Sequence, residues 1–137
     1  MPVPTHVFDP PFNILRSSHV VLDVVDLKAS RAFYENAVGL HVEDADSDTV
    51  YLRAVEEHQH HSLVLRKAAT AACHRLGFRV ASENDLDKAA AWFAANGITY
   101  SFVERPFQGR TMHVTDPFGF QIELFPLGVA QLSRAYE

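Results

Sequence analysis

An internal repeat constrains the fold of this chain more than any other feature of its sequence. An apolar, strand-like segment and a following helix that stops at Gly39 occur again as a second such segment and a helix that stops at Gly97. The equivalent strand positions Val20 and Leu76 lie 56 residues apart. One unit of this length would leave an apolar sheet face exposed, so we expect two units to pack together around a core.

Each unit follows the order of one strand, one helix and three further strands. Asp26 and Ser82 are the predicted N-caps of the two helices, and the turn-rich segment Asp44–Asp48 separates two strands of the first unit. The dipeptides DP and FG, with Asp116 holding the turn, mark the last hairpin. We predict helices at 26–38 and 83–96, and strands at 18–25, within 40–57 (two strands), 61–68, 75–81, 99–107, 110–116 and 120–126.

Composition excludes several classes of protein. Of the 137 residues, 47% are apolar and 21% charged, which rules out a disordered or collagen-like chain, and no apolar run is long enough to cross a bilayer. A net charge of −5 without a basic cluster indicates neither a nucleic-acid nor a membrane partner. The N-terminus lacks a secretory signal pattern, and we expect the single cysteine, Cys73, to be a buried thiol in a reducing cytoplasm. The eight histidines are the one unusual feature.

The alternation of side chains along the strands brings ionisable residues to one face of the sheet. If the apolar positions of each strand face a helix, their neighbours face the concave side. This concave set comprises His19, Val21, Asp23, Arg75, Gly77, Arg79, Gln121, Glu123 and Phe125. Buried ionisable groups are costly unless they are paired or bind something. We therefore expect a pocket there, with the first and last strands side by side and with His19 and Glu123 sharing one hollow.

The segments HVVLDVVDLKASRAFYENAVGL and DPFGFQIELF resemble the vicinal oxygen chelate superfamily, which includes glyoxalase I, bleomycin resistance proteins and extradiol catechol dioxygenases. Within it, TVYLRAVEEHQHHSLVLRKA is most similar to the N-terminal domain of homoprotocatechuate-type extradiol dioxygenases. The resemblance runs from about Ile14 to Phe125. It implies an α+β fold in which two βαβββ modules, at about 16–68 and 74–126, form a cupped, partly open mixed β-barrel with the helices outside. The domain would span 1–137, and the resemblance implies a homodimer.

The resemblance also implies a metal site of two histidines and one carboxylate, suited to Fe(II) or Mn(II). His19 matches the first ligand and Glu123 the carboxylate, whereas Arg75 occupies the place of the middle ligand. Arginine stays protonated and is no ordinary metal ligand, so the neighbouring His74 would complete the set only if its strand is bulged or shifted. Val64 stands where glyoxalase I would carry a further carboxylate, which disfavours a glyoxalase.

Two more histidines match groups that act near the metal in extradiol enzymes. His61 resembles the acid–base histidine, and His113 stands where those enzymes carry a hydrogen-bonding tyrosine or histidine. Both are therefore candidate catalytic residues. We expect His58 and His60 to lie at a strand edge in contact with solvent.

These predictions are compatible with three functions. The first is metal-dependent ring cleavage of a catechol-type substrate with O₂, by an extradiol-type dioxygenase. The second is metal-free binding of a small aromatic or anionic molecule, with Arg75 and Arg79 supplying the charge and Arg75 paired with Glu123 in place of a metal. The third is a non-catalytic module that supports a partner chain.

Overall fold

The order of one strand, one helix and three strands occurs twice in the computed structural model, which describes residues 9–126. The first module consists of β1 (Ile14–Val24), α1 (Leu27–Ala32) with its π-helical continuation η1 (Phe33–Ala37), β2 (His41–Ala45), β3 (Thr49–Arg53) and β4 (Leu63–Lys67). The second consists of β5 (Ala72–Val80), α2 (Glu83–Ala95), β6 (Tyr100–Arg105), β7 (Gly109–Thr115) and β8 (Gln121–Pro126). The predicted domain limits, 1 and 137, lie outside the described residues.

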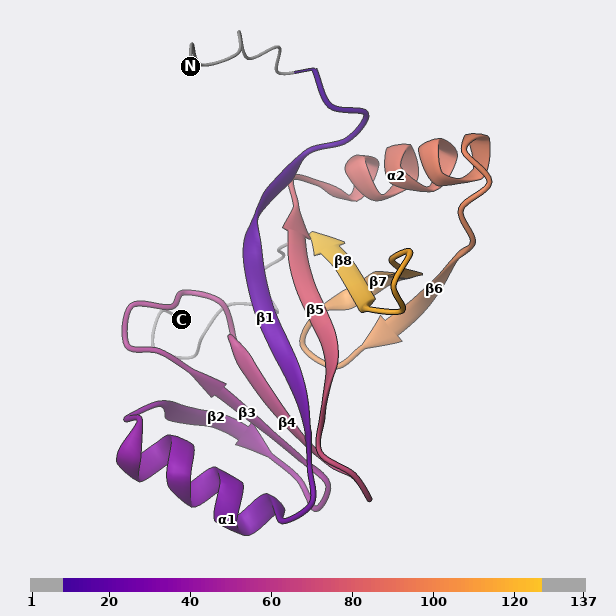
Figure 1. Ribbon diagram of the computed structural model, residues 1–137. Coiled ribbons are helices and arrows are strands. Elements are labelled where there is room, and N and C mark those ends of the chain that lie inside the picture. Colours follow the sequence, from indigo (N-terminus) through magenta and orange to yellow (C-terminus); the bar gives the residue numbers. More distant parts are fainter. Residues whose placement is uncertain (1–8, 127–137) are drawn as a thin grey trace, which may run out of the picture.

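The eight strands of the described residues form one mixed sheet in the order β2-β3-β4-β1-β5-β8-β7-β6 (Figure 1). The modules meet where β1 pairs antiparallel with β5, and within each module the first strand runs parallel to the last. The sheet is cupped and not closed, so the predicted α+β fold is confirmed. The expectation that the first and last strands are neighbours is wrong, because β5 lies between β1 and β8.

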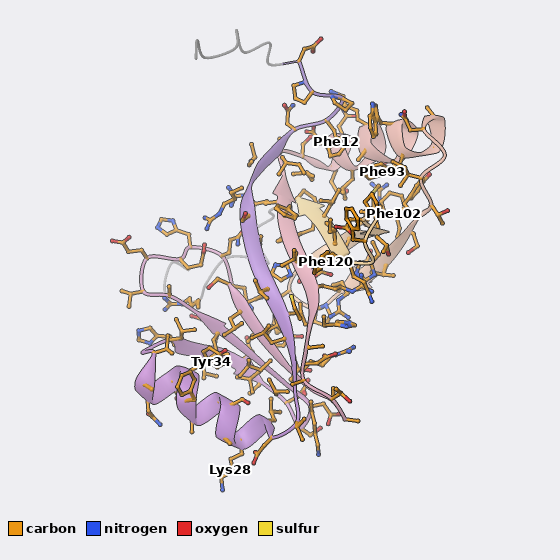
Figure 2. The ribbon with its side chains drawn as sticks, in the orientation of Figure 1. Phe12, Lys28, Tyr34, Phe93, Phe102 and Phe120 are labelled. Carbon is orange, nitrogen blue, oxygen red and sulfur yellow. The ribbon has the colours of Figure 1, made fainter. Side chains whose placement is uncertain are left out.

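The convex face of the first module packs against α1. Asp26 caps this helix, since its Oδ1 accepts a hydrogen bond from the backbone N–H of Ala29 at 3.0 Å. Leu22 and Val24 of β1 belong to the same apolar cluster as Tyr34 of η1 (Figure 2). The predicted alternation of β1 is therefore confirmed for its helix-facing side.

The convex face of the second module packs against α2 in the same way. Phe78 of β5 and Leu124 of β8 share a cluster with Leu86 of the helix. Phe12, which precedes β1, packs edge-on against Phe93 of α2 with 5.6 Å between the ring centroids (Figure 2). The helix-facing positions of β5 and β8 thus agree with the sequence pattern, and the concave face is left for the remaining side chains.

Neither helix in the described part of the chain has the length and apolar character that a membrane span requires. Cys73, however, is exposed on β5 and is not the buried thiol that we expected. Cys73 is the second residue of β5, and the first two residues of this strand are both exposed.

Candidate functional site

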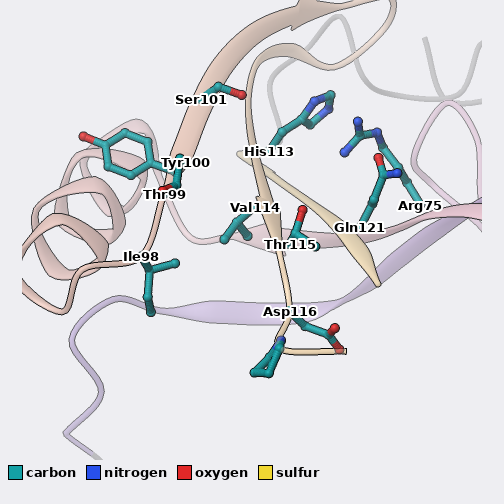
Figure 3. Close-up of a pocket in the computed structure, with 11 residues that line it drawn as sticks. Arg75, Ile98, Thr99, Tyr100, Ser101, His113, Val114, Thr115, Asp116 and Gln121 are labelled. Carbon is teal, nitrogen blue, oxygen red and sulfur yellow. The ribbon is translucent and has the colours of Figure 1, made fainter. Parts of the chain in front are cut away.

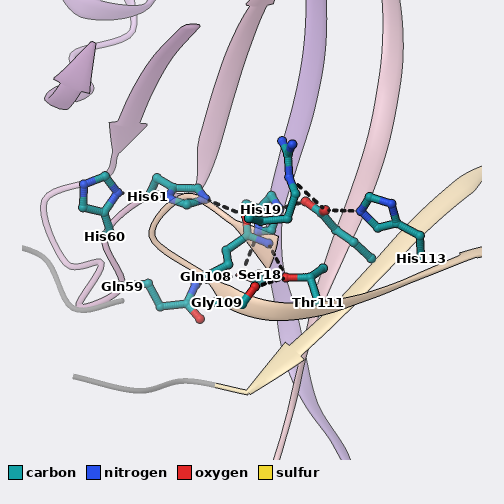
Figure 4. Close-up of polar contacts among 11 residues, drawn as sticks. Ser18, His19, Gln59, His60, His61, Gln108, Gly109, Thr111 and His113 are labelled. Carbon is teal, nitrogen blue, oxygen red and sulfur yellow. Dashed lines mark hydrogen bonds and ion pairs between the residues drawn. The ribbon is translucent and has the colours of Figure 1, made fainter. Parts of the chain in front are cut away.

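A row of polar side chains crosses four strands on the concave face. The strand register aligns His19 of β1 with Gly77 of β5, Gly77 with Glu123 of β8, and Glu123 with His113 of β7. Nε2 of His19 lies 2.5 Å from Oε1 of Glu123, and Nε2 of His113 lies 3.0 Å from Oε2. His19 and Glu123 therefore meet, although their strands are not neighbours, and both side chains are completely buried. Figure 4 shows the polar contacts around His19 and His113.

Gly77 is the reason that His19 can reach across an intervening strand. A Cβ atom at this position would lie 2.3 Å from Cε1 and 2.6 Å from Nε2 of the His19 ring. The imidazole therefore occupies the space that any other side chain would need. The sequence alone placed Gly77 on the concave face but did not indicate that it makes room for a ring.

A β-bulge in β1 orients His19. The register with β5 slips between Ser17 and His19, so Ser18 is the extra residue on β1. A bulge can turn two consecutive side chains to the same face, and the Ser18 Oγ lies 3.0 Å from Nδ1 of His19. Gln59 donates from Nε2 to the same Oγ at 2.9 Å, and Arg79 donates to Gln59 Oε1 at 3.4 Å. Arg79 therefore acts on His19 indirectly, because it holds Gln59, which in turn holds the hydroxyl of Ser18.

Glu123 is fully buried and is held as an anion. Burial by itself raises the pKa of this carboxyl, but the hydrogen bond and charge of His19, the hydrogen bond of His113 and the charge of Arg105 lower it to about 2. Nε of Arg105 lies 3.9 Å from Oε2. Burial lowers the pKa of His113, while its hydrogen bond to Glu123 acts in the opposite direction.

A second group of polar side chains lies beside His19, and the sequence predicted only part of it. His60 is 3% exposed, not solvated as we expected, and its Nε2 lies 2.5 Å from an oxygen of Asp44. Its ring stacks on Phe107 with the centroids 3.8 Å apart. The Nδ1 atoms of His60 and His61 lie 3.0 Å apart, and Nε2 of His61 lies 3.2 Å from Oε1 of Gln108. His58 is exposed, as expected.

The candidate acid–base residue, His61, lies against the row. Its ring centroid is 5.0 Å from that of His19. Burial lowers the pKa of His61 to about 3, and the charges of His19 and His60 act in the same direction. His61 is therefore a neutral imidazole at neutral pH, and its role in proton transfer stays a prediction.

Arg75 lines a pocket together with His113 of β7. The pocket has a volume of about 580 Å³ and is lined by Arg75, His113, Gln121 and Ser101 among others (Figure 3). Burial lowers the pKa of the Arg75 guanidinium, the charge of Glu123 raises it, and the charges of Arg105 and Arg66 lower it. Arg75 is not in ion-pair contact with Glu123 among the described residues; His19 and His113 contact the carboxylate oxygens, and Arg105 is the arginine that lies within ion-pair distance.

His74 lies next to Arg75 but does not join the row. The register between β1 and β5 passes from Val21–Arg75 to Leu22–Cys73, so β5 has the bulge at His74 on which the ligand role of this residue depended. The ring nevertheless turns to Asp23 and Arg66. Its Nδ1 lies 3.6 Å from Asp23 Oδ2 and 3.1 Å from an Arg66 nitrogen. The structure therefore brings together His19, Glu123 and His113, and leaves His74 outside.

These side chains do not fit the implied metal site. A first-row metal ion lies about 2.0–2.2 Å from its nitrogen and oxygen ligands, so two ligands of one ion are about 3 Å apart. His19 and Glu123 are closer than that and are in direct hydrogen bond, while His113 approaches the other carboxylate oxygen. The place of the middle ligand is held by Arg75, a permanent cation. Within residues 9–126, no group of three or more histidine, cysteine, aspartate or glutamate side chains is arranged to hold a metal ion.

Comparisons with known proteins agree with the fold. Residues 16–124 match the family model of the Glyoxalase/Bleomycin resistance protein/Dioxygenase superfamily. The chain is 27% identical over 118 residues to metapyrocatechase of Geobacillus stearothermophilus, which covers 85% of this chain and 36% of the relative. It is 27% identical over 115 residues to a manganese-dependent 2,3-dihydroxybiphenyl 1,2-dioxygenase of Geobacillus genomosp. 3, covering 82% of this chain and 36% of that enzyme.

A solved structure is similar over nearly the whole chain. It is the complex of homoprotocatechuate 2,3-dioxygenase from Brevibacterium fuscum with 3,4-dihydroxyphenylacetate, with a TM-score of 0.82 and 37% identity. The match covers 95% of this chain and 42% of that one. The chain thus spans well under half the length of each of these relatives.

Proposed function

The chain belongs to the Glyoxalase/Bleomycin resistance protein/Dioxygenase superfamily, and from that premise we propose that its cup binds a small aromatic anion through Arg75 without a metal. One observation carries this proposal. At the position of the family's middle ligand the chain has a guanidinium that faces a pocket, and the carboxylate of Glu123 is already bound by two imidazoles.

The balance of charge favours an anionic ligand. Asp23 is paired with Arg66 at 2.7 Å, and Glu123 is hydrogen-bonded to His19 and His113. Asp23 and Glu123 are therefore committed to other partners, and Arg75 has no hydrogen-bonding acid among the described residues, although the charge of Glu123 acts on it. A partly buried guanidinium in this position is well suited to a carboxylate, which it can bind with two parallel hydrogen bonds.

The walls of the pocket favour an aromatic ligand. Ile98, Val114 and Pro117 contribute apolar atoms to the lining, while Ser101 and Gln121 supply polar atoms (Figure 3). The Tyr100 ring points away from Arg75 and packs against the core next to α2 (Figure 3). Pockets for small molecules commonly combine an apolar lining with a few placed polar groups. An arylacetate has both features, and a similar structure was solved with 3,4-dihydroxyphenylacetate.

Isothermal titration calorimetry with 3,4-dihydroxyphenylacetate tests this function in the presence of a chelator. We expect Arg75→Gln to weaken binding by about 10–100-fold, the effect of losing a charged hydrogen-bonding partner. Arg31→Gln is the matched control, because Arg31 lies on α1, outside the Arg75 pocket, and forms an exposed ion pair with Glu35 at 3.3 Å. Equal affinity of the wild-type and Arg75→Gln proteins would contradict the proposal.

Metal-dependent ring cleavage is the second candidate, because His19 and Glu123 stand at two of the three implied ligand positions. It would require Fe(II) or Mn(II), with His61 as acid–base and His113 as the orienting group. Metal analysis of tag-free protein, followed by reconstitution and measurement of O₂ uptake with 3,4-dihydroxyphenylacetate, separates the candidates. Bound metal with O₂ uptake in the wild type would favour this second function. If the alignment is right, Arg75→His strengthens metal binding by completing the donor set.

Oligomerisation is a separate proposal that rests on the family. A homodimer is expected, and a support role for a partner chain would instead give a stable complex of two different chains. Size-exclusion chromatography with light scattering distinguishes a monomer from a homodimer, and a pull-down identifies a different partner.

A further inference from the structure

We propose that the turn between β6 and β7, residues 106–108, is a strained latch that closes the first module's half of the cup over His60 and His61. The latch opens to admit a small molecule to these buried histidines and then closes again. This inference goes beyond the binding of an anion at Arg75. It concerns the half of the cup that the first module forms, and it holds whichever of the candidate functions is right.

The backbone of this turn is strained. The N–H of Gln108 donates to the carbonyl oxygen of Arg105 at 3.1 Å, which closes a four-residue turn with Pro106 second and Phe107 third. The φ of Phe107 is 61°, and no other non-glycine residue among residues 9–126 has a positive φ. Turns with a positive φ at the third position normally carry glycine or asparagine there. A bulky residue is strained in this conformation, which persists only when surrounding contacts hold it.

The ring of Phe107 supplies such contacts, and it makes them with the first module. It stacks on the imidazole of His60, with 3.8 Å between the ring centroids and 9° between the ring planes. It meets the ring of Tyr51 edge-on at 5.0 Å and packs against the apolar cluster that contains Val21 and Val64. Aromatic pairs of these kinds stabilise a structure beyond the area that they bury. Contacts across the cup therefore offset the strain of the turn.

The side chain of Gln108 makes a further contact across the cup. Its Oε1 lies 3.2 Å from Nε2 of His61, and its Nε2 donates to Oγ1 of Thr111 at 3.4 Å. Figure 4 shows Gln108 and His61 facing each other from the two modules. Gln108 is 4% exposed, and His60 and His61 are each 3% exposed. The closed turn thus covers both histidines, and a molecule reaches them from this side only when the turn moves.

The same features make the turn easier to open than a segment of the core. The Phe107 ring is only half-buried and Pro106 is exposed, so opening brings little additional apolar surface into contact with water. Opening also releases the strain at Phe107. Short surface segments of this kind can open locally while the rest of the domain stays folded, and such movements commonly control access to binding sites.

Modification of histidines by diethyl pyrocarbonate at about pH 7.5 tests the latch, because an exposed histidine is mostly neutral there and reacts according to its accessibility. Mass spectrometry compares His61 with the exposed His58 on the same tryptic peptide, residues 54–66. We expect Phe107→Ala to raise the rate at His61 relative to His58 by about 10-fold or more, because the ring contacts are lost while the strain remains. Phe107→Gly should raise it less, since glycine adopts a positive φ without strain.

Phe118→Ala is the matched control, because Phe118 is 87% exposed in the hairpin turn between β7 and β8. His61 should react as slowly in this variant as in the wild type. Circular dichroism and urea denaturation establish whether each variant is folded. Unchanged protection of His61 in a folded Phe107→Ala protein would overturn the latch, as would a Phe107→Gly protein that reacts faster than Phe107→Ala. Faster reaction that accompanies global unfolding would also overturn it, because Phe107 would then be part of the fixed core.

Discussion

Replacing Gly77 with alanine should destabilise the protein through the ring of His19. The added carbon would lie 2.3 Å from Cε1 and 2.5 Å from Nδ1 of His19, whereas ordinary van der Waals contact begins at 3.4 Å. The side chain of His19 is completely buried and its ring is rigid. It must therefore move away from β5 and give up its hydrogen bond to Glu123.

The expected cost follows from two terms of the same sign and one of opposite sign. Overpacking a close-packed interior costs about 1–3 kcal/mol, and loss of a hydrogen bond to a charged group costs about 1.5–3 kcal/mol. Alanine would otherwise be favoured over glycine in a strand by about 0.5–1 kcal/mol. We expect Gly77→Ala to lower the free energy of unfolding by about 2–5 kcal/mol, a large part of the roughly 5–15 kcal/mol of a typical domain.

Urea denaturation followed by circular dichroism measures this difference. A double-mutant cycle isolates the ring, because Gly77→Ala should cost little in a His19→Ala background. Two results would refute the reasoning: the same cost with and without the imidazole, or a Gly77→Ala protein as stable as the wild type. Either result would mean that the close approach of the ring to β5 does not determine this position.

Three further predictions concern the buried ionisable groups. The folded-state pKa of Glu123 is lowered to about 2 from the usual 4.5. Its contribution to stability is therefore complete above about pH 4.5 and is lost as the pH falls towards 2. In urea unfolding, the free energy of unfolding of Glu123→Gln should depend less steeply on pH in that window. Because the pKa of His61 is lowered to about 3 from 6.5, stability should fall as the pH falls below 6.5, and His61→Gln should remove this part of the pH dependence between 6.5 and 3. Asp44→Asn removes the charged partner of buried His60 and should cost about 1–3 kcal/mol of unfolding free energy, whereas Asp48→Asn, on the exposed turn, should cost less than about 0.5 kcal/mol by the same assay.

The sequence predicts the faces of the strands better than it predicts their neighbours. Side chains alternate with a period of two whatever the order of strands in the sheet, so Leu22 and Leu124 face helices and Glu123 faces the cup, as expected. Strand order depends on long-range pairing, for which one chain carries no local signal. For this reason β5 was not placed between β1 and β8.

The missed residues lie where alternation does not apply. Gln59 and His60 belong to the loop between β3 and β4, and Gln108 to the turn between β6 and β7. A loop has no period from which burial can be inferred. His74 shows the same limit inside a strand, because a bulge changes the direction of a side chain and its presence depends on the pairing with β1.

The two modules share a backbone plan but contribute differently to the concave face. Where β5 and β8 pair Gly77 with Glu123, the equivalent strands β1 and β4 pair Val21 with Val64. The valine pair fills its space and is covered by Tyr51 in an apolar cluster. Gly77 leaves a space next to the carboxylate of Glu123. The ring of His19, which comes from the other module, occupies this space and forms a hydrogen bond with the carboxylate. The polar row therefore depends on side chains of both modules, and neither βαβββ unit could hold this site alone.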